Sequence, residues 1–170
     1  KINEHGKRAN GIINAMLLHS RSGEGRPEEE ADLNALVSES VDLAYHAVRA
    51  KDPHFDLRID SAYEEGLAPV SVASADFGRV VINLVDNACY AMRDKKKRGV
   101  AGYEPRLSVQ TRTVGDRAEL RIRDNGAGVP ASVLTEIWNP FFTTKPTGEG
   151  AGLGLSISHD IVVGHGGEIR

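Results

Sequence analysis

The sequence has 170 residues, of which 40% are hydrophobic and 26% are charged, a composition typical of a globular domain with a short appendage. Its net charge of −3 provides no basic field for nucleic acid, so we expect no nucleic-acid partner. The single cysteine, Cys89, excludes an internal disulfide, and together with the six histidines it shows no metal-ligand spacing.

The sequence has no apolar run that approaches the length of a membrane span, and no signal peptide is visible. We therefore expect a cytoplasmic fragment that makes no membrane contact, while membrane anchoring of the full-length protein stays open. The sequence begins inside a helical pattern, and residues 166–170 at its end read as the start of a strand. Both ends indicate a fragment of a longer protein.

A helix is expected over residues 1–21, because Ile2, Ala9 and Met16 recur every seven residues. This spacing is typical of a helix that packs in a bundle or coiled coil. Residues 22–30, which are rich in Gly and Glu, have the composition of a linker. We therefore expect a separate helix joined through a hinge to a domain over residues 31–170, which is truncated at its C-terminus.

The domain is expected to begin with a helix from residue 33 to about residue 50, with Asp32 as its N-cap and its end before Pro53. Alternating apolar residues over 55–59 then predict a half-buried strand. Residues 69–73 are its expected hairpin partner.

A second helix, over about residues 76–93, carries two asparagines on one face. Asn83 and Asn87 lie four residues apart, one turn from each other, beside an apolar stripe. Asparagine is a mediocre helix former, so the pair needs an explanation. Surface hydration is one explanation, and the other is that the amide oxygens reach a phosphate or a hard cation such as Mg²⁺.

Two further strands are expected over residues 107–111 and 118–123, and they lead into the motif Asp124-Asn125-Gly126-Ala127-Gly128. This arrangement holds a carboxylate at the end of a sheet, and the glycines leave room for a flat ligand. The carboxylate can accept a hydrogen bond from an amino group such as that of adenine. An ordinary turn has the same composition, so both interpretations stay open.

The remaining motifs lie after a short helical piece that is expected over residues 132–138. The two phenylalanines of residues 139–145 are typical of an anchor, and Lys145 is either an exposed lysine or a phosphate contact. Alternating glycines at 148, 150, 152 and 154 then lead into an amphipathic helical pattern. A glycine-rich loop at a helix N-terminus is an anion site, and the spacing matches neither a Walker A loop nor a dinucleotide fingerprint. The loop also indicates a mobile lid that closes over a nucleotide.

Taken in order, these four motifs resemble the N, G1, F and G2 boxes of sensor histidine kinases of two-component systems. The boxes are Asn83 to Ala88, the Asp124 motif, residues 139–145 and residues 148–155. The wider ATP-binding superfamily includes gyrase, Hsp90 and MutL. The resemblance implies an α/β two-layer sandwich, a mixed β-sheet covered by helices on one face (the Bergerat-type ATP-binding fold), preceded by one bundle helix.

The resemblance also implies roles for single residues. Asn87 would coordinate Mg²⁺ through the phosphates of ATP, with Asn83 beside it, and Asp124 would bind the adenine amino group. The implied catalytic residues are Asn83, Asn87 and Lys145. The remaining implied nucleotide-binding residues are Gly126, Gly128, Phe142, Gly150, Gly152, Leu153 and Gly154. The implied partners are a second copy of the intact protein, as a homodimer, and the receiver domain of a response regulator.

Two departures from the family pattern bear on the reaction. The hydrolysing members carry Glu where this chain has Asn83, and an amide cannot take a proton from water, which favours a histidine kinase over an ATPase. No acceptor-histidine motif is visible, and His5 falls on the apolar seam of residues 1–21, so we expect the acceptor upstream. The alternatives are an ATPase or clamp of the gyrase–Hsp90–MutL type and a nucleotide-binding module without catalysis.

Overall fold

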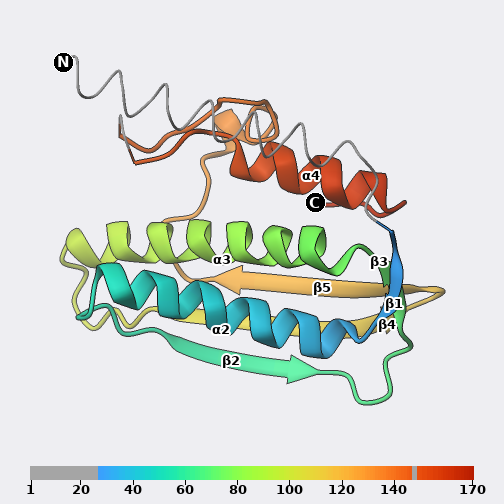
Figure 1. Ribbon diagram of the computed structural model, residues 1–170. Coiled ribbons are helices and arrows are strands. Elements are labelled where there is room, and N and C mark those ends of the chain that lie inside the picture. Colours follow the sequence, from blue (N-terminus) through green and yellow to red (C-terminus); the bar gives the residue numbers. More distant parts are fainter. Residues whose placement is uncertain (1–26, 147–148) are drawn as a thin grey trace. The chain divides into compact units, whose positions relative to one another are not determined.

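Two long helices and a three-stranded sheet make up the larger part of the described chain (Figure 1). The computed structural model describes residues 27–146 and 149–170. Within them the chain divides into two compact units, Glu28–Val129 and a second unit that contains Pro130–Arg170. The expected bundle helix of residues 1–21 lies outside the described residues.

Helix α2 (Leu33–Lys51) begins and ends close to where the sequence predicts. The side chain of Asp32 accepts hydrogen bonds from the backbone N–H groups of Asn34 and Ala35, at 2.9 and 3.2 Å, and so acts as the expected N-cap. The helix ends at Lys51 with Asp52 as its C-cap, because the ring of Pro53 disfavours the helical conformation of the residue before it.

The sheet is formed by β2 (Arg58–Tyr63), β4 (Arg106–Val114) and β5 (Arg117–Asp124), in the order β2-β4-β5. Strand β2 pairs parallel with β4, and β5 pairs antiparallel with β4. The expected mixed sheet of an α/β fold is thereby confirmed. The short strands β1 (Glu29–Ala31) and β3 (Val70–Val72) form a separate antiparallel pair.

Helices α2 and α3 (Ser74–Lys97) cover one face of this sheet (Figure 1). Full burial of each aliphatic side chain contributes about 1.5–3 kcal/mol, so this layer is the main source of stability in the unit. Cys89 is one of the buried residues, and burial, followed by the charge of Asp86, raises the pKa of its thiol to about 11. The buried core consists of Leu33, Val37, Val41, Ala44, Val48, Phe55, Leu57, Val81, Val85, Ala88, Cys89, Met92, Leu107 and Val109.

Side chains of the opposite sheet face form ion pairs at the surface. Arg58 lies 2.8 Å from Asp60, and Arg112 lies 2.8 Å from Glu119. Exposed pairs of this kind contribute about 0–1 kcal/mol each. The fold of the unit therefore depends on the helix-covered face.

Two expectations for the first strands are wrong. Residues 55–57 are not part of the strand, which begins at Arg58. Phe55 and Leu57 alternate because both are buried in the core, and the N–H of Leu57 donates to the hydroxyl of Tyr45 at 3.3 Å instead of joining a strand ladder. The hairpin partner is also wrong, because β3 pairs with β1 while β2 pairs with β4. The linker expected over residues 22–30 overlaps a strand, because Glu29 and Glu30 lie in β1.

The second unit contains one 3₁₀ turn, η1 (Ala131–Val133), and helix α4 (Gly154–Gly164) among its described residues. The helical piece expected over residues 132–138 is thus reduced to a single turn followed by further turns. The ring of Trp138 lies 5.8 Å from the ring of His159 on α4, which fixes the end of these turns against the helix.

The end of α4 differs from the sequence expectation. Residues 166–170, which are expected to begin a strand, do not form one. Gly166 has a φ of +69°, and the N–H of Gly167 donates to the carbonyl of Val162 at 2.9 Å. These two glycines form a helix C-cap, which is why they do not begin a strand. No helix in the part of the chain that the structure describes is long and apolar enough to cross a membrane.

The contact between Glu64 and β4 generates a prediction about pH. The carboxylate of Glu64 accepts hydrogen bonds from the backbone N–H and the hydroxyl of Thr113, at 2.7 and 2.8 Å, and these bonds lower the pKa of Glu64 below its ordinary value of 4.5. A carboxyl whose pKa is lowered by folding adds stability above its unfolded pKa and loses it as the pH falls through the folded pKa. Glu64→Gln should therefore be less stable than the wild type at pH 7, and the difference in urea midpoint should shrink as the pH falls through the lowered pKa of Glu64.

Thr113→Val serves as the companion variant, because it removes the hydroxyl donor and keeps the backbone N–H. It should show a smaller loss of stability with the same dependence on pH. A difference between Glu64→Gln and wild type that stays constant from pH 7 to low pH would contradict this assignment.

Candidate nucleotide-binding site

One face of α3 carries both candidate asparagines. Asn83 and Asn87 are each half-buried and lie one helical turn apart. Ala91 and Lys95 continue the same row at intervals of four residues. The two amide side chains are therefore not ordinary exposed helix positions.

The carboxylate of Asp124 lies at the end of β5, where Asp124 is opposite Leu107 of β4. Its Oδ1 accepts a hydrogen bond from the backbone N–H of Gly126 at 2.8 Å, which closes the turn formed by residues 124–128, here called the Asp124 turn. A carboxylate has a second oxygen that can accept a hydrogen bond from a ligand. The side chain is half-buried, so its orientation is set by the turn.

The Asp124 turn packs directly against the row of α3 that carries the asparagines. A Cβ at Gly126 would lie 2.8 Å from the carbonyl carbon and from the Cβ of Ala91, and 2.7 Å from Oδ1 of Asp124. Real Cβ atoms do not approach so closely, so the turn can reach the helix at this point because residue 126 is a glycine. Gly128 has a φ of +72°, a conformation that also favours glycine.

The contact at Ala91 brings two sets of expected site residues together within one unit. Asn87 lies one turn from Ala91 along the helix, and Asn83 lies two turns away. The carboxylate of Asp124 and the two amides therefore follow one another along a single helix face. Their roles toward a ligand stay predictions.

The second unit brings together the segment 139–145 and the glycine-rich loop. Gly152 has a φ of +70°, and a Cβ there would lie 2.4 Å from the carbonyl carbon of Phe141 and 2.7 Å from the carbonyl oxygen of Phe142. A Cβ at Gly150 would lie 3.0 Å from Cδ of Lys145. Gly152 is thus needed for close packing of the loop, in addition to any role toward a phosphate, whereas the nearest neighbour of Gly150 is a flexible lysine side chain.

The paired phenylalanines differ from each other. Phe142 is half-buried, whereas Phe141 is 47% exposed and has a φ of +68°. A positive φ is rare for a bulky residue, and such strained conformations concentrate at functional sites. Phe142 is therefore the anchor of the pair.

Helix α4 begins directly after the glycine-rich loop. Its N-cap residue is Leu153, which provides no capping side chain, and the helix starts at Gly154. The geometry of a glycine-rich loop that feeds a helix N-terminus is as the sequence predicts.

The expected Mg²⁺ ion needs further ligands besides the residues named above. No group of three or more His, Cys, Asp or Glu residues that could hold a metal occurs among the described residues. The half-buried amide of Asn87 offers the oxygen donor that Mg²⁺ prefers, and phosphate oxygens commonly complete such a site. The residues present therefore fit a metal that arrives with a nucleotide.

Sequence reasoning did not single out Lys95 and Tyr103. Nζ of Lys95 donates to the carbonyl oxygens of Asn125 and Gly126, at 2.7 and 3.2 Å, and lies 4.7 Å from the ring centroid of Tyr103. The sequence signal for Lys95 is its place on the row of Asn83 and Asn87, three turns after the first asparagine. No comparable signal marks Tyr103.

Curated relatives align with most of the length of this sequence but are much longer proteins. The chain is 32% identical to the sensor kinase CckA of Brucella abortus over 99% of the chain, and 32% identical to the histidine-protein kinase AtoS of Escherichia coli over 95% of it. It spans 18% of the length of the first and 24% of the length of the second.

The fold is also that of solved histidine kinases. A mycobacterial sensor histidine kinase, MprB, superposes with a TM-score of 0.61 and 27% identity, covering 82% of this chain and 80% of that chain. The family of histidine kinase-, DNA gyrase B- and HSP90-like ATPases matches residues 72–170, which is more than half of the sequence. The chain therefore belongs to the histidine kinase-, DNA gyrase B- and HSP90-like ATPase family.

Proposed function

We propose that the chain is the ATP-binding catalytic domain of a sensor histidine kinase, in which Asp124 binds the adenine amino group and Asn87 faces Mg²⁺ and the phosphates. The observation that carries this proposal is the packing of Gly126 on Ala91. That contact holds the turn beside Ala91, one helical turn from Asn87 and two turns from Asn83 on the same helix row. A nucleotide is long enough to need one group for its base and others, further along the same surface, for its phosphates. This arrangement matters because phosphoryl transfer depends on positioning and charge neutralisation.

The residue at position 83 favours transfer to a histidine over hydrolysis. Attack by water needs a base that removes a proton, and the amide of Asn83 cannot act as one. A neutral imidazole is already nucleophilic and needs no strong base. Lys145 and the glycines of the glycine-rich loop remain proposed phosphate contacts.

The intact protein would be a homodimer that passes the phosphoryl group from its own histidine to the receiver domain of a response regulator. The support for these partners is that both relatives described above are named sensor or histidine kinases. A cytoplasmic location of this domain is part of the same proposal, since ATP is its substrate.

Replacement of Asp124 tests the adenine contact. Asp124→Asn removes the charge of the acceptor, so its affinity for a non-hydrolysable ATP analogue should fall by about tenfold or more, as expected for a hydrogen bond to a charged group. Calorimetric titration of the 170-residue chain measures this affinity. Asp116→Asn, an exposed aspartate in the turn between β4 and β5, is the matched control and should bind like wild type.

Replacement of Asn87 tests the cation. Asn87→Ala should bind the analogue equally with and without Mg²⁺, whereas wild type should bind more tightly with it, because the alanine offers no oxygen ligand. Titrations in Mg²⁺ and in EDTA give both values for the same variant. If Mg²⁺ raises the affinity of Asn87→Ala for the analogue as much as it does for the wild type, Asn87 does not have the assigned role toward Mg²⁺.

The competing ATPase function predicts a different result. We expect no sustained ATP hydrolysis by the wild-type chain in a steady-state phosphate-release assay, and phosphoryl transfer once an acceptor helix is supplied. Steady hydrolysis that Asn83→Ala abolishes would support the ATPase instead. A wild-type chain that binds no adenine nucleotide would favour a degenerate nucleotide-binding module or a purely interaction module.

A further inference from the structure

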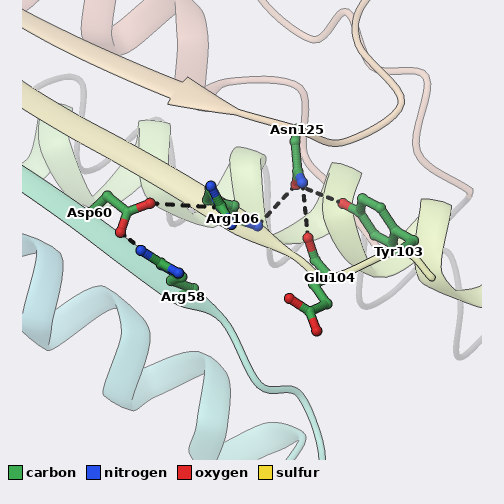
Figure 2. A network of polar contacts seen from close by, with 6 residues as sticks. All are labelled: Arg58, Asp60, Tyr103, Glu104, Arg106 and Asn125. Carbon is green, nitrogen blue, oxygen red and sulfur yellow. Dashed lines mark hydrogen bonds and ion pairs between the residues drawn. The ribbon is translucent and has the colours of Figure 1, made fainter.

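The residue after Asp124 closes the ladder between β4 and β5 with its side chain. The backbone N–H of Asn125 donates to the carbonyl of Arg106 at 3.2 Å, as in a regular antiparallel pair. The N–H of Arg106, however, donates to the side-chain Oδ1 of Asn125 at 2.9 Å (Figure 2). The side chain thus takes the place that the backbone carbonyl of Asn125 would have in a continuing ladder.

The side chain of Asn125 makes two further hydrogen bonds to the segment before β4. Its Oδ1 also accepts from the hydroxyl of Tyr103 at 3.0 Å, and its Nδ2 donates to the carbonyl of Glu104 at 2.9 Å (Figure 2). The Tyr103 hydroxyl is a donor at neutral pH, and burial, followed by the nearby charge of Asp124, raises its pKa further above the ordinary value of 10. Both polar atoms of the amide are thus hydrogen-bonded to residues 103–106.

The backbone carbonyl of Asn125, which does not pair with β4, is bound by a side chain of α3. Nζ of Lys95 donates to this carbonyl oxygen of Asn125 at 2.7 Å and to that of Gly126 at 3.2 Å. The same ammonium lies 4.7 Å from the centre of the Tyr103 ring, within the range of a cation–π contact. Lys95, Tyr103 and Asn125 therefore form one cluster, here called the latch, that joins the Asp124 turn to α3 and to β4.

We infer that the latch positions the carboxylate of Asp124 and thereby sets the preference of the site for adenine over other purines. The inference rests on the proposed function of the site. Oδ1 of Asp124 accepts a hydrogen bond from the N–H of Gly126. The two carbonyls that flank this N–H along the backbone, those of Asn125 and Gly126, both accept hydrogen bonds from Lys95. The direction of the carboxylate thus depends on the latch.

The consequence for specificity follows from hydrogen-bond chemistry. A carboxylate accepts a bond from the exocyclic amino group of adenine, but it faces a carbonyl oxygen at the same position of hypoxanthine. Hydrogen bonds weaken steeply as their angle departs from linear, so a displaced carboxylate loses this discrimination. Contacts to the phosphates do not depend on it.

The test compares an adenine nucleotide with a hypoxanthine nucleotide. The probes are the non-hydrolysable analogues of ATP and of ITP, titrated by calorimetry into the wild-type chain, Asn125→Ala, Tyr103→Phe and Lys95→Met. We expect Asn125→Ala and Lys95→Met to weaken binding of the ATP analogue by about tenfold, as for loss of one or two polar contacts, and Tyr103→Phe by less. Affinity for the ITP analogue should stay within about twofold, so the ratio of the two affinities falls.

Lys96→Met is the matched control, because Lys96 is the adjacent and exposed lysine of the same helix. Lys96→Met should keep the wild-type ratio of the two affinities. Asn125→Asp retains the acceptor oxygens, so its ratio should lie between those of Asn125→Ala and the wild type. Circular dichroism establishes that each variant is folded, and Tyr103→Phe and Lys95→Met still test the inference if Asn125→Ala does not fold.

Two results would overturn the inference, and they differ from failure of the proposed function. If the latch variants bind both analogues more weakly by the same factor, the latch has only a structural role. If every latch variant binds both analogues with wild-type affinity, the latch does not influence Asp124. A wild-type chain that binds neither analogue, or binds both equally, would overturn the proposed adenine contact and the inference with it.

Discussion

The close contact between the Asp124 turn and α3 is the constraint on which the candidate site depends. At Gly126 the backbone of the turn touches Ala91 with no room for a side chain. Because α3 is itself fixed by its buried face against the sheet, this contact transmits the rigidity of the core to a loop. A loop held in this way presents its carboxylate without an entropic cost of ordering at the time of binding.

The sequence predicted the elements whose signals are local. The cap at Asp32, the apolar stripe of α3 and the turn at Gly115 each follow from residues close in the chain, and all are found. The four motifs also lie on a helix, a strand end and two loops as predicted, and for all except residues 139–145 the reason is that glycine or a polar residue adjoins a regular apolar pattern.

Strand pairing and side-chain contacts between distant segments could not be predicted. The partner of β2 is β4, which lies far along the chain, and the nearby β3 has a similar pattern but pairs with β1. Burial of Phe55 and Leu57 produced a strand-like alternation outside a strand. Tyr103 has no comparable signal, because its importance comes from its contact with Asn125, and the signal of Lys95 is only its place on the row of Asn83 and Asn87.

The parallel pairing of β2 and β4 has a consequence for how the sheet closes. Arg58 pairs with Arg106, so positions 58 and 106, which are 48 residues apart, must meet, whereas β4 and β5 are joined by a two-residue turn. Loop-closure entropy rises with the length of the segment, so most of this entropic cost falls on the β2–β4 pair. Helix α3 lies within that segment, which means that the element carrying the asparagines is also the connection that closes the sheet. A ligand that binds the native arrangement of α3 would accordingly stabilise the pairing of two strands that it does not touch.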